Sequence, residues 1–254
     1  MNDYEKLSEV FRQIADARKH FEKELYVLLV LFEMFKIGKD SKILDAACGT
    51  GDVARLVHDR GYHKVFLSDG AKSMLSMVDK AEKWYEDIAE KRWEEIGDLF
   101  PRWGKFDFVY FLGNSVAHSP LSVLEEVFGS VYEGLNGGGV LVFDVRRWKK
   151  SSDGGLVDGG REPGIWRLLQ KVYYDNEKYL LFDKVSYKGG EQRVEYIFFP
   201  ESSSCNSFCE TLSYHIFSWE DAVDVLEKVG FPSDSIKVLE IQEWPYLVVT
   251  ARKM

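Results

Sequence analysis

Apolar residues near the start of the chain recur every three or four positions between Tyr4 and Met34, which predicts helices with one buried face. From there to about residue 150, short apolar runs typical of buried strands alternate with helical patterns. The predicted strands cover residues 41–47, 63–69, 92–98, 106–114 and 139–146, and the predicted helices cover 51–61, a stretch from Met74 to Trp84, and 121–135. This alternation predicts a parallel sheet with helices on both faces.

The pattern changes after residue 150. Residues 151–164 are rich in glycine and polar side chains, which predicts a loop. The aromatic and β-branched runs that follow predict an antiparallel sheet, with a hairpin turn at 188–190. A helical pattern at 218–231 precedes two further strands, at 236–241 and 246–252. Because the link between these strands is short, we expect them to pair antiparallel.

These changes of pattern divide the chain into four parts. We expect an N-terminal helical segment (1–40), a cofactor-binding Rossmann-like core (41–150), an inserted antiparallel β region or lid (151–217), and a C-terminal helix and β hairpin (218–254). The hairpin would complete the core sheet. The predicted fold class is therefore α/β, with a seven-stranded Rossmann-like sheet, N-terminal helices, and a β insertion between the fifth strand and the last helix.

The composition indicates a globular protein with a small-molecule partner. The 254 residues are 45% hydrophobic, and 33 basic against 42 acidic residues give a net charge of −9, which argues against nucleic acid or anionic lipid as a partner. No secretory leader pattern opens the chain, and the longest apolar run, 25–32, is too short to span a bilayer, so we expect a cytoplasmic protein. Cys205 and Cys209 lack neighbouring ligands, and no metal site is expected.

The turn after the first core strand, in KILDAACGTGDVA (42–54), is the first candidate site. Gly49 and Gly51 allow a sharp turn and close approach of a ligand, and they also fit a dinucleotide fingerprint. Asp45 favours a ligand with an ammonium group over a pyrophosphate, whereas Asp69, at the end of the next strand, suits ribose hydroxyls in either ligand. The alternative is that Asp45 pairs with a helix N-terminus and Asp69 caps a helix.

Four segments together resemble a known family. ILDAACGTG (43–51) and LSDGAKSML (67–75) resemble the first two motifs of class I S-adenosylmethionine-dependent methyltransferases. With FDFVYFLGNSVAH (106–118) and LVFDVRRW (141–148), the resemblance extends to the glycine/sarcosine N-methyltransferase group, over about residues 18–150. It implies a Rossmann-like methyltransferase fold that uses S-adenosylmethionine and releases S-adenosylhomocysteine.

The resemblance implies a set of cofactor-binding residues near the strand ends. The set comprises Arg18, Asp45, Ala47, Gly49, Gly51, Asp69, Met74, Asp98, Leu99, Leu112 and His118. Asp69 would bind the ribose hydroxyls. Asp98, through its side chain, and Leu99, through its backbone, would bind the adenine. The Leu112 carbonyl would accept a hydrogen bond from the amino group of the cofactor.

Two members of this set have open alternatives. Arg18 is expected to bind the cofactor carboxylate, but Lys19 or Lys23 could take this role because the helical register depends on an insertion. Met74 is expected beside the adenine, yet its spacing also fits an ordinary helix core.

The same resemblance implies two residues on the acceptor side. Arg146, at the end of the fifth strand, would bind a carboxylate with both guanidinium nitrogens, and Asn114 would orient the neighbouring amine. The alternatives are a surface ion pair for Arg146 and a turn position for Asn114. Trp148 stands where the family has a tyrosine and is followed by two lysines, which would suit a larger carboxylate-bearing acceptor.

We therefore predict methyl transfer to the amine of a small amino acid such as glycine or sarcosine. Two alternatives are transfer to another small-molecule amine or hydroxyl, and cofactor binding by a non-catalytic regulator. A dinucleotide oxidoreductase has the least support, because no Tyr-x-x-x-Lys pair accompanies the glycines. A small-molecule acceptor is the expected partner, without nucleic acid or membrane.

Overall fold

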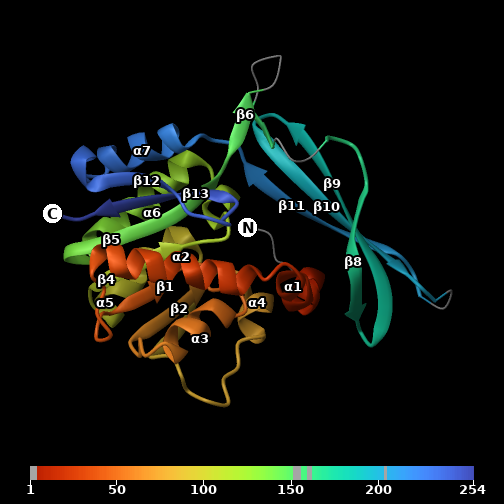
Figure 1. Cartoon of the computed structure of the whole chain (residues 1–254), viewed down its shortest axis with the longest axis horizontal. Helices are drawn as coiled ribbons and strands as arrows, with labels where there is room; N and C mark the ends of the chain where they lie inside the picture. Colours follow the sequence, from red (N-terminus) through yellow and green to blue (C-terminus); the bar gives the residue numbers. More distant parts are fainter. Residues whose placement is uncertain (1–4, 151–155, 159–161, 203–204) are drawn as a thin grey trace.

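The chain is described by a computed structural model that covers residues 5–150, 156–158, 162–202 and 205–254; most of the loop predicted at 151–164 lies outside these ranges. Its main sheet has seven strands in the order β12-β13-β5-β4-β1-β2-β3 (Figure 1). The strands are β1 (Ile43–Asp45), β2 (Val65–Asp69), β3 (Asp87–Glu90), β4 (Phe106–Phe111), β5 (Leu135–Arg146), β12 (Ile236–Glu240) and β13 (Tyr246–Arg252). Strands β1 to β5 are parallel, and β13 pairs antiparallel with β5 and β12, which confirms the Rossmann-like fold class and the C-terminal hairpin.

Helices cover both faces of this sheet. They are α1 (Glu5–Ala17), α2 (His20–Phe35), α3 (Asp52–Asp59), α4 (Lys72–Ser76), α5 (Leu99–Trp103), α6 (Leu121–Gly134) and α7 (Trp219–Lys228), with 3-10 turns η1 (Trp93–Asp98), η2 (Ser115–His118) and η3 (Ser233–Ser235). Ile43 of β1 packs in an apolar core with α2 and α3, and the next residue, Leu44, packs in a second core with α6 and α7. In the described part of the chain, no helix is long and apolar enough to cross a membrane.

Two of the predicted elements are wrong. Within the strand predicted at 92–98, residues Trp93–Asp98 form η1 instead, and β3 lies just before it. The apolar spacing there reflects burial of Trp93 and Ile96, and the Trp93 indole donates to the Ala46 carbonyl at 2.9 Å. The helix predicted from Met74 to Trp84 ends at Ser76 with α4.

The physical reason for the short α4 lies in the loop that follows it. The Asp79 carboxylate accepts from Ala81 N, and the Asp79 carbonyl accepts from the Trp84 indole at 3.2 Å. These bonds hold a non-helical loop that still buries Trp84. The apolar spacing of this segment therefore indicates which side chains are buried, but it does not indicate a continuous helix.

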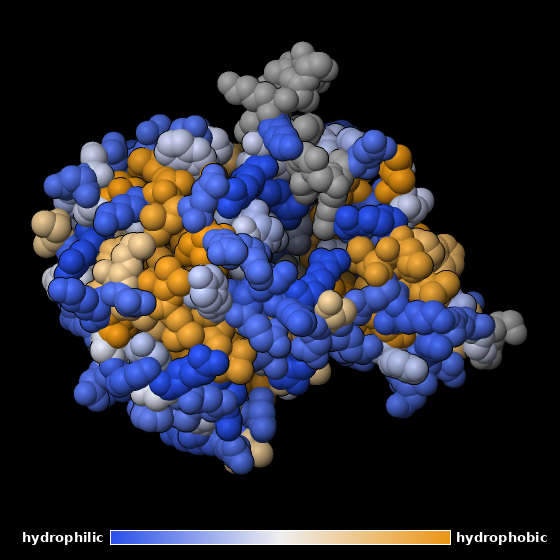
Figure 2. Space-filling model, in the orientation of Figure 1, coloured by the Kyte–Doolittle hydropathy of each residue, from blue (hydrophilic) through white to orange (hydrophobic). Residues whose placement is uncertain are grey.

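A second sheet follows β5 in the chain and precedes α7, as predicted for the insertion. Its strands, in the order β11-β10-β9-β8, are β8 (Arg167–Tyr174), β9 (Glu177–Lys188), β10 (Glu191–Pro200) and β11 (Phe208–His215), all antiparallel. A two-stranded ribbon, β6 (Trp148–Lys150) with β7 (Leu156–Asp158), lies before it. Apolar residues are exposed at the right of Figure 2, over this part of the molecule. Ile165, Leu168 and Phe199, in or before the strands of the second sheet, are exposed large apolar side chains.

Helix α1 lies between the two sheets and is bonded to both (Figure 1). Toward the main sheet, Arg12 donates to both Asp52 carboxylate oxygens at 2.9 and 3.0 Å, and to the Thr50 and Met77 carbonyls. Toward the second sheet, Gln13 exchanges two 2.8 Å hydrogen bonds with the Tyr173 backbone. These contacts make α1 one wall of the space between the sheets.

Candidate active site

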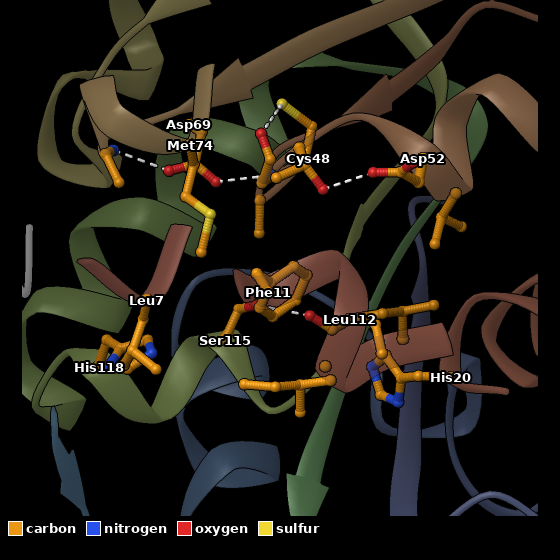
Figure 3. A pocket seen from close by; sticks show the side chains of 18 of the residues that line it. Leu7, Phe11, His20, Cys48, Asp52, Asp69, Met74, Leu112, Ser115 and His118 are labelled. Atoms are coloured by element: carbon orange, nitrogen blue, oxygen red, sulfur yellow. Dashed lines mark hydrogen bonds between the residues drawn. The ribbon is translucent and has the colours of Figure 1, made fainter. Parts of the chain in front are cut away.

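A cavity of about 240 Å³ lies where the C-terminal ends of β1, β2 and β4 meet α1 and the second sheet. Asp69, Met74 and Cys48 lie along one side of it in Figure 3, and His118, Ser115 and Leu112 lie along the other. Further lining residues are Leu7, Phe11 and Ile14 of α1, Trp93, and the tyrosines Tyr196, Tyr214 and Tyr246. The cavity is therefore mostly apolar, with a few polar groups at the strand ends, as is typical of a small-molecule site.

The glycine turn supplies one wall of this cavity. Gly49 and Gly51 have φ angles of 53° and 78°, in the left-handed region that favours glycine. A Cβ added to Gly49 would meet no atom within 4 Å, whereas one added to Gly51 would meet Val78 at 3.3 Å. Gly49 therefore leaves room for a ligand beside the turn, and Gly51 allows the turn to pack on the core.

Asp69 links the turn to the end of β2. One carboxylate oxygen accepts from Gly49 N and the other from Ala71 N, both at 2.8 Å. Burial raises the pKa of Asp69, and these backbone hydrogen bonds oppose the rise. A carboxylate has about four acceptor positions, so Asp69 can hold the turn and still accept hydrogen bonds from a ligand in the cavity.

Asp45 lies behind the turn and does not line the cavity that the described residues form. Its carboxylate accepts from the Tyr110 hydroxyl at 2.8 Å and from Ala47 N at 3.3 Å. Burial raises the pKa of Asp45 to about 7. It also raises the pKa of Glu24 of α2 well above its ordinary value, with additional contributions from Asp45 and Asp144. Asp45 can therefore act on a cationic ligand only from behind the turn, where it lies in a buried cluster of acidic residues with Glu24 and Asp144.

The structure brings seven of the predicted site residues to the cavity: Arg18, Ala47, Gly49, Asp69, Met74, Leu112 and His118. Among the described residues, Asp45, Gly51, Asp98, Leu99, Asn114 and Arg146 are predicted site residues that do not line it. The Asp98 carboxylate points to the surface, where Lys91 donates to it at 2.8 Å. Leu99 is buried in the core with α6. The adenine contacts predicted for Asp98 and Leu99 therefore involve residues outside the cavity that the described residues form, and they stay predictions.

Asn114 lies just behind the cavity wall. It has a φ of 60° and begins η2, and its side chain is 1% exposed. Neither Nδ2 nor Oδ1 of Asn114 has a hydrogen-bond partner among the residues that the structure describes. Its neighbours Gly113 and Ser115 both line the cavity. A buried amide without partners is rare in proteins and commonly marks a place where a ligand or water completes the bonding.

Arg146 lies beside the cavity, at the end of β5. Its guanidinium carbon is 5.6 Å from the Trp148 ring centre, 5.7 Å from Tyr214 and 5.8 Å from Tyr246. Tyr214 and Tyr246 line the cavity, so Arg146 lies one layer behind the cavity wall. Cation–π contacts with three rings hold the guanidinium in place and favour its charge.

His118 is a neutral hydrogen-bonding group in this site. Its Nδ1 is 3.2 Å from the Ser213 carbonyl of β11, and because a carbonyl only accepts, Nδ1 carries the proton. Burial lowers the pKa of His118 to about 4, and its ring packs against Tyr214 with centroids 4.6 Å apart. In this tautomer, Nε2 is the acceptor nitrogen of the ring.

Sequence patterns did not identify the cavity residues of α1 or Trp93. The three- and four-residue spacing of Leu7, Phe11 and Ile14 gave a buried face, but it did not say what that face covers. Trp93 was assigned to a strand. Its position is fixed by the long-range bond to Ala46, which no local pattern reports.

We expect the free energy of unfolding to fall as the pH rises from about 4 to about 7. Burial raises the pKa values of Asp45 and Asp144 to about 7, so in this range the folded chain keeps protons that the unfolded chain has released. Their contribution is fully present below pH 4 and is lost as the pH passes 7. Urea unfolding at pH 5 and pH 7 should show a smaller fall for Asp45→Asn than for the unmodified chain. Equal falls would contradict the assignment to Asp45.

Comparison with known proteins gives three related findings. Residues 43–139 match the family described as "Methyltransferase domain". Over 151 residues, the chain is 28% identical to glycine N-methyltransferase from Rattus norvegicus, covering 54% of this chain and 47% of that protein. The chain thus spans about half the length of the curated relatives it matches.

Solved structures show the same fold over nearly the whole chain. CalS10 from Micromonospora echinaspora, described as an amino pentose methyltransferase and solved with S-adenosylmethionine bound, has a TM-score of 0.72 at 16% identity, with 92% of each chain covered. An S-adenosylmethionine-dependent methyltransferase from Clostridium acetobutylicum also has a TM-score of 0.72 at 16% identity, with 99% of each chain covered. At this identity, the likeness concerns the fold.

Proposed function

We propose that this chain, whose residues 43–139 match the family described as "Methyltransferase domain", transfers a methyl group to the amine of a small carboxylate-bearing acceptor such as glycine or sarcosine. S-adenosylmethionine supplies the methyl group when bound. The protein's part is to hold an amine lone pair in line with the departing bond and to exclude water.

Asn114 carries the proposal. Its buried amide has an acceptor oxygen and two donor hydrogens that no described residue satisfies, and it lies between two residues of the cavity wall. The Oδ1 atom can accept a hydrogen bond from an amine N–H, which would orient the nitrogen. Occupation by an acceptor would also remove the cost of the unpaired buried amide.

The cavity also fits the cofactor. The open space beside Gly49 gives its methionyl part access to the turn, and Asp69 retains acceptor capacity for ribose hydroxyls. Arg18 lines the cavity and offers a positive charge for a carboxylate. The apolar side chains of Leu7, Phe11 and others from α1 would keep water away from the reacting atoms.

Arg146 supports an acceptor with a carboxylate. Its charge is held beside the cavity, and a guanidinium can bind both carboxylate oxygens. With the carboxylate bound there and the amine at Asn114, the acceptor would have a fixed orientation. Electrostatic attraction alone would not distinguish acceptors of this class by size.

A second candidate acceptor is an amino sugar. Tyr214 and Tyr246 line the cavity, and aromatic rings can pack against the face of a sugar. Arg146 lies behind these two rings, and an amino sugar has no carboxylate that would need to reach it. CalS10, which has the same fold, is described as an amino pentose methyltransferase.

A radiolabelled methyl-transfer assay tests the function. We expect methylation of glycine or sarcosine from a panel that also contains an amino sugar, a small hydroxyl compound and RNA, with the product identified by mass. Transfer to the amino sugar alone would favour the second candidate. Cofactor binding by calorimetry with no transfer to any panel member would indicate a non-catalytic regulator.

A further inference from the structure

One buried carboxylate joins several walls of the cavity. Asp144 lies near the end of β5, two residues before Arg146, and is 0% exposed. Residues two apart on a strand lie on the same face of the sheet, so both side chains lie on the side that α2 covers. Asp144 itself does not line the cavity that the described residues form.

Three hydrogen-bond donors converge on Asp144. Asn114 N donates to Oδ1 at 2.6 Å, and Gly113 N donates to Oδ2 at 3.2 Å. The Trp244 indole donates to the same Oδ2 at 2.9 Å. All three partners only donate, which matches the acceptor-only character of an ionised carboxylate.

These bonds fix two separate segments of the site. Gly113 and Asn114 have φ angles of 78° and 60°, so this turn adopts a left-handed backbone at two successive residues. Asn114 is not a glycine, and such a conformation has an energetic cost that other contacts must offset. The two N–H bonds to Asp144 supply these contacts and thereby hold the amide that the proposed function assigns to the acceptor amine.

The third bond reaches the other side of the cavity. The Trp244 ring stacks on His20 with centroids 5.2 Å apart and packs edge to face on Tyr246 at 5.6 Å. His20 and Tyr246 both line the cavity. Asp144 therefore connects the turn after β4, the segment before β13 and the start of α2.

The ionisation of Asp144 depends on its charged neighbours. Among the described residues, Arg146 on β5 lowers the pKa of Asp144, and Glu24 on α2 interacts with both Asp144 and Asp45 of β1. His20 on α2 lies 3.5 Å from Glu24 and stacks on Trp244. Burial raises the pKa of Asp144 to about 7, while its three hydrogen bonds and Arg146 oppose the rise. The same burial lowers the pKa of His20 to about 4, so His20 adds no charge at neutral pH.

We propose that Asp144 is a positioning residue: its ionised carboxylate holds the Gly113–Asn114 turn and Trp244 in the arrangement that orients the acceptor. This inference rests on the proposed function. Protonation would put a hydrogen on an oxygen that faces only donors and would weaken the hold on the turn. Turnover should then fall as the pH drops from about 7 to 5, whereas binding of the cofactor at the glycine turn should change less.

Asp144→Asn tests this role. The amide can still accept from Asn114 N, but its NH₂ group would face the N–H groups of Gly113 and Trp244. We expect kcat to fall by about tenfold to a hundredfold, because a small misplacement of reacting groups has an effect of that size. We expect KM for S-adenosylmethionine to change by less than about threefold, because Asp144 is proposed to act on the chemical step and not on cofactor binding. Protonation of the acceptor amine lowers turnover of both proteins as the pH falls, so the fall in kcat below pH 7 should be less steep in the variant than in the unmodified chain.

Asp87→Asn is the matched control. Asp87 also accepts from a tryptophan indole, that of Trp103 at 2.9 Å, but it lies in β3 at the far edge of the sheet. We expect its kcat and pH profile to match those of the unmodified chain. Trp244→Phe removes one donor to Asp144 and keeps an aromatic ring, and it replaces Asp144→Asn as the test if that variant folds poorly. We expect Trp244→Phe to lower kcat less than Asp144→Asn would.

Amide hydrogen exchange provides a measurement that does not need turnover. Exchange over residues 112–118 should be faster in Asp144→Asn and unchanged in Asp87→Asn. Unchanged exchange, or a kcat and pH profile like those of the unmodified chain, would overturn the positioning role. If the unmodified chain methylates no acceptor, the proposed function fails, and the exchange measurement still decides whether Asp144 holds the turn.

Discussion

Gly49→Val should weaken binding of S-adenosylmethionine by about fivefold to about two orders of magnitude. The added side chain would occupy the open space beside the turn, where a Cβ meets no protein atom within 4 Å. Forcing extra methyl groups into a filled site costs about 1–3 kcal/mol, and each 1.4 kcal/mol is about a factor of ten in affinity. Calorimetric titration with the cofactor measures the effect.

The backbone at Gly49 requires a matched control. Its φ of 53° is unfavourable for valine wherever it occurs, so the variant should also lose thermal stability. Gly189, in the hairpin between β9 and β10, has a φ of 60° and equally open surroundings. Gly189→Val should lower the melting temperature similarly and leave cofactor affinity unchanged. Cofactor affinity within threefold of normal in Gly49→Val would show that the ligand does not lie against the turn.

Arg146→Ala should reduce kcat/KM for a carboxylate acceptor by on the order of 10² to 10³. Removing one partner of a buried, hydrogen-bonded charge pair costs about 2–5 kcal/mol. The loss should appear with glycine or sarcosine and be small for an acceptor without a carboxylate. Steady-state kinetics with both kinds of acceptor measure this difference.

Arg147→Ala is the control for the loss of charge. Arg147 follows directly in the chain, but it is partly exposed and pairs with Glu240 at 3.0 Å, an interaction of small energy at a surface. We expect its kinetics to stay within about twofold of normal. If Arg146→Ala behaves like Arg147→Ala with the true acceptor, the acceptor is not recognised through a carboxylate, and the amino sugar becomes the better candidate.

The sequence predicted the parts of the site that depend on local geometry. Apolar runs that end at Asp45 and Asp69 located two strand ends, and the glycines after the first strand located the turn. Because the C-terminal ends of parallel strands meet at one edge of a sheet, these residues come together once the fold class is known. The antiparallel pairing of β12 and β13 followed in the same way from a short link.

The remaining parts depend on contacts between distant segments. The pattern over α1 predicted a buried face, yet its place over the cavity depends on Arg12 and on partners 38 to 65 residues away. The resemblance implies an adenine contact for Asp98, but in the structure its carboxylate accepts from Lys91, seven residues earlier in the chain. The three donors of Asp144 come from two segments that no periodicity connects.

The position of β13 has a consequence for how the site is made during synthesis. β13 comes after all other strands in the chain, yet it lies inside the sheet, between β5 and β12. A ribosome releases the chain from its N-terminus, so the edge of β5 stays unpaired while the insertion and α7 emerge. Trp244 and Tyr246 arrive only with β13, so the cavity wall is closed last. The glycine turn therefore emerges well before the residues that close the acceptor side of the cavity, and the edge of β5 has no partner from β13 in that interval.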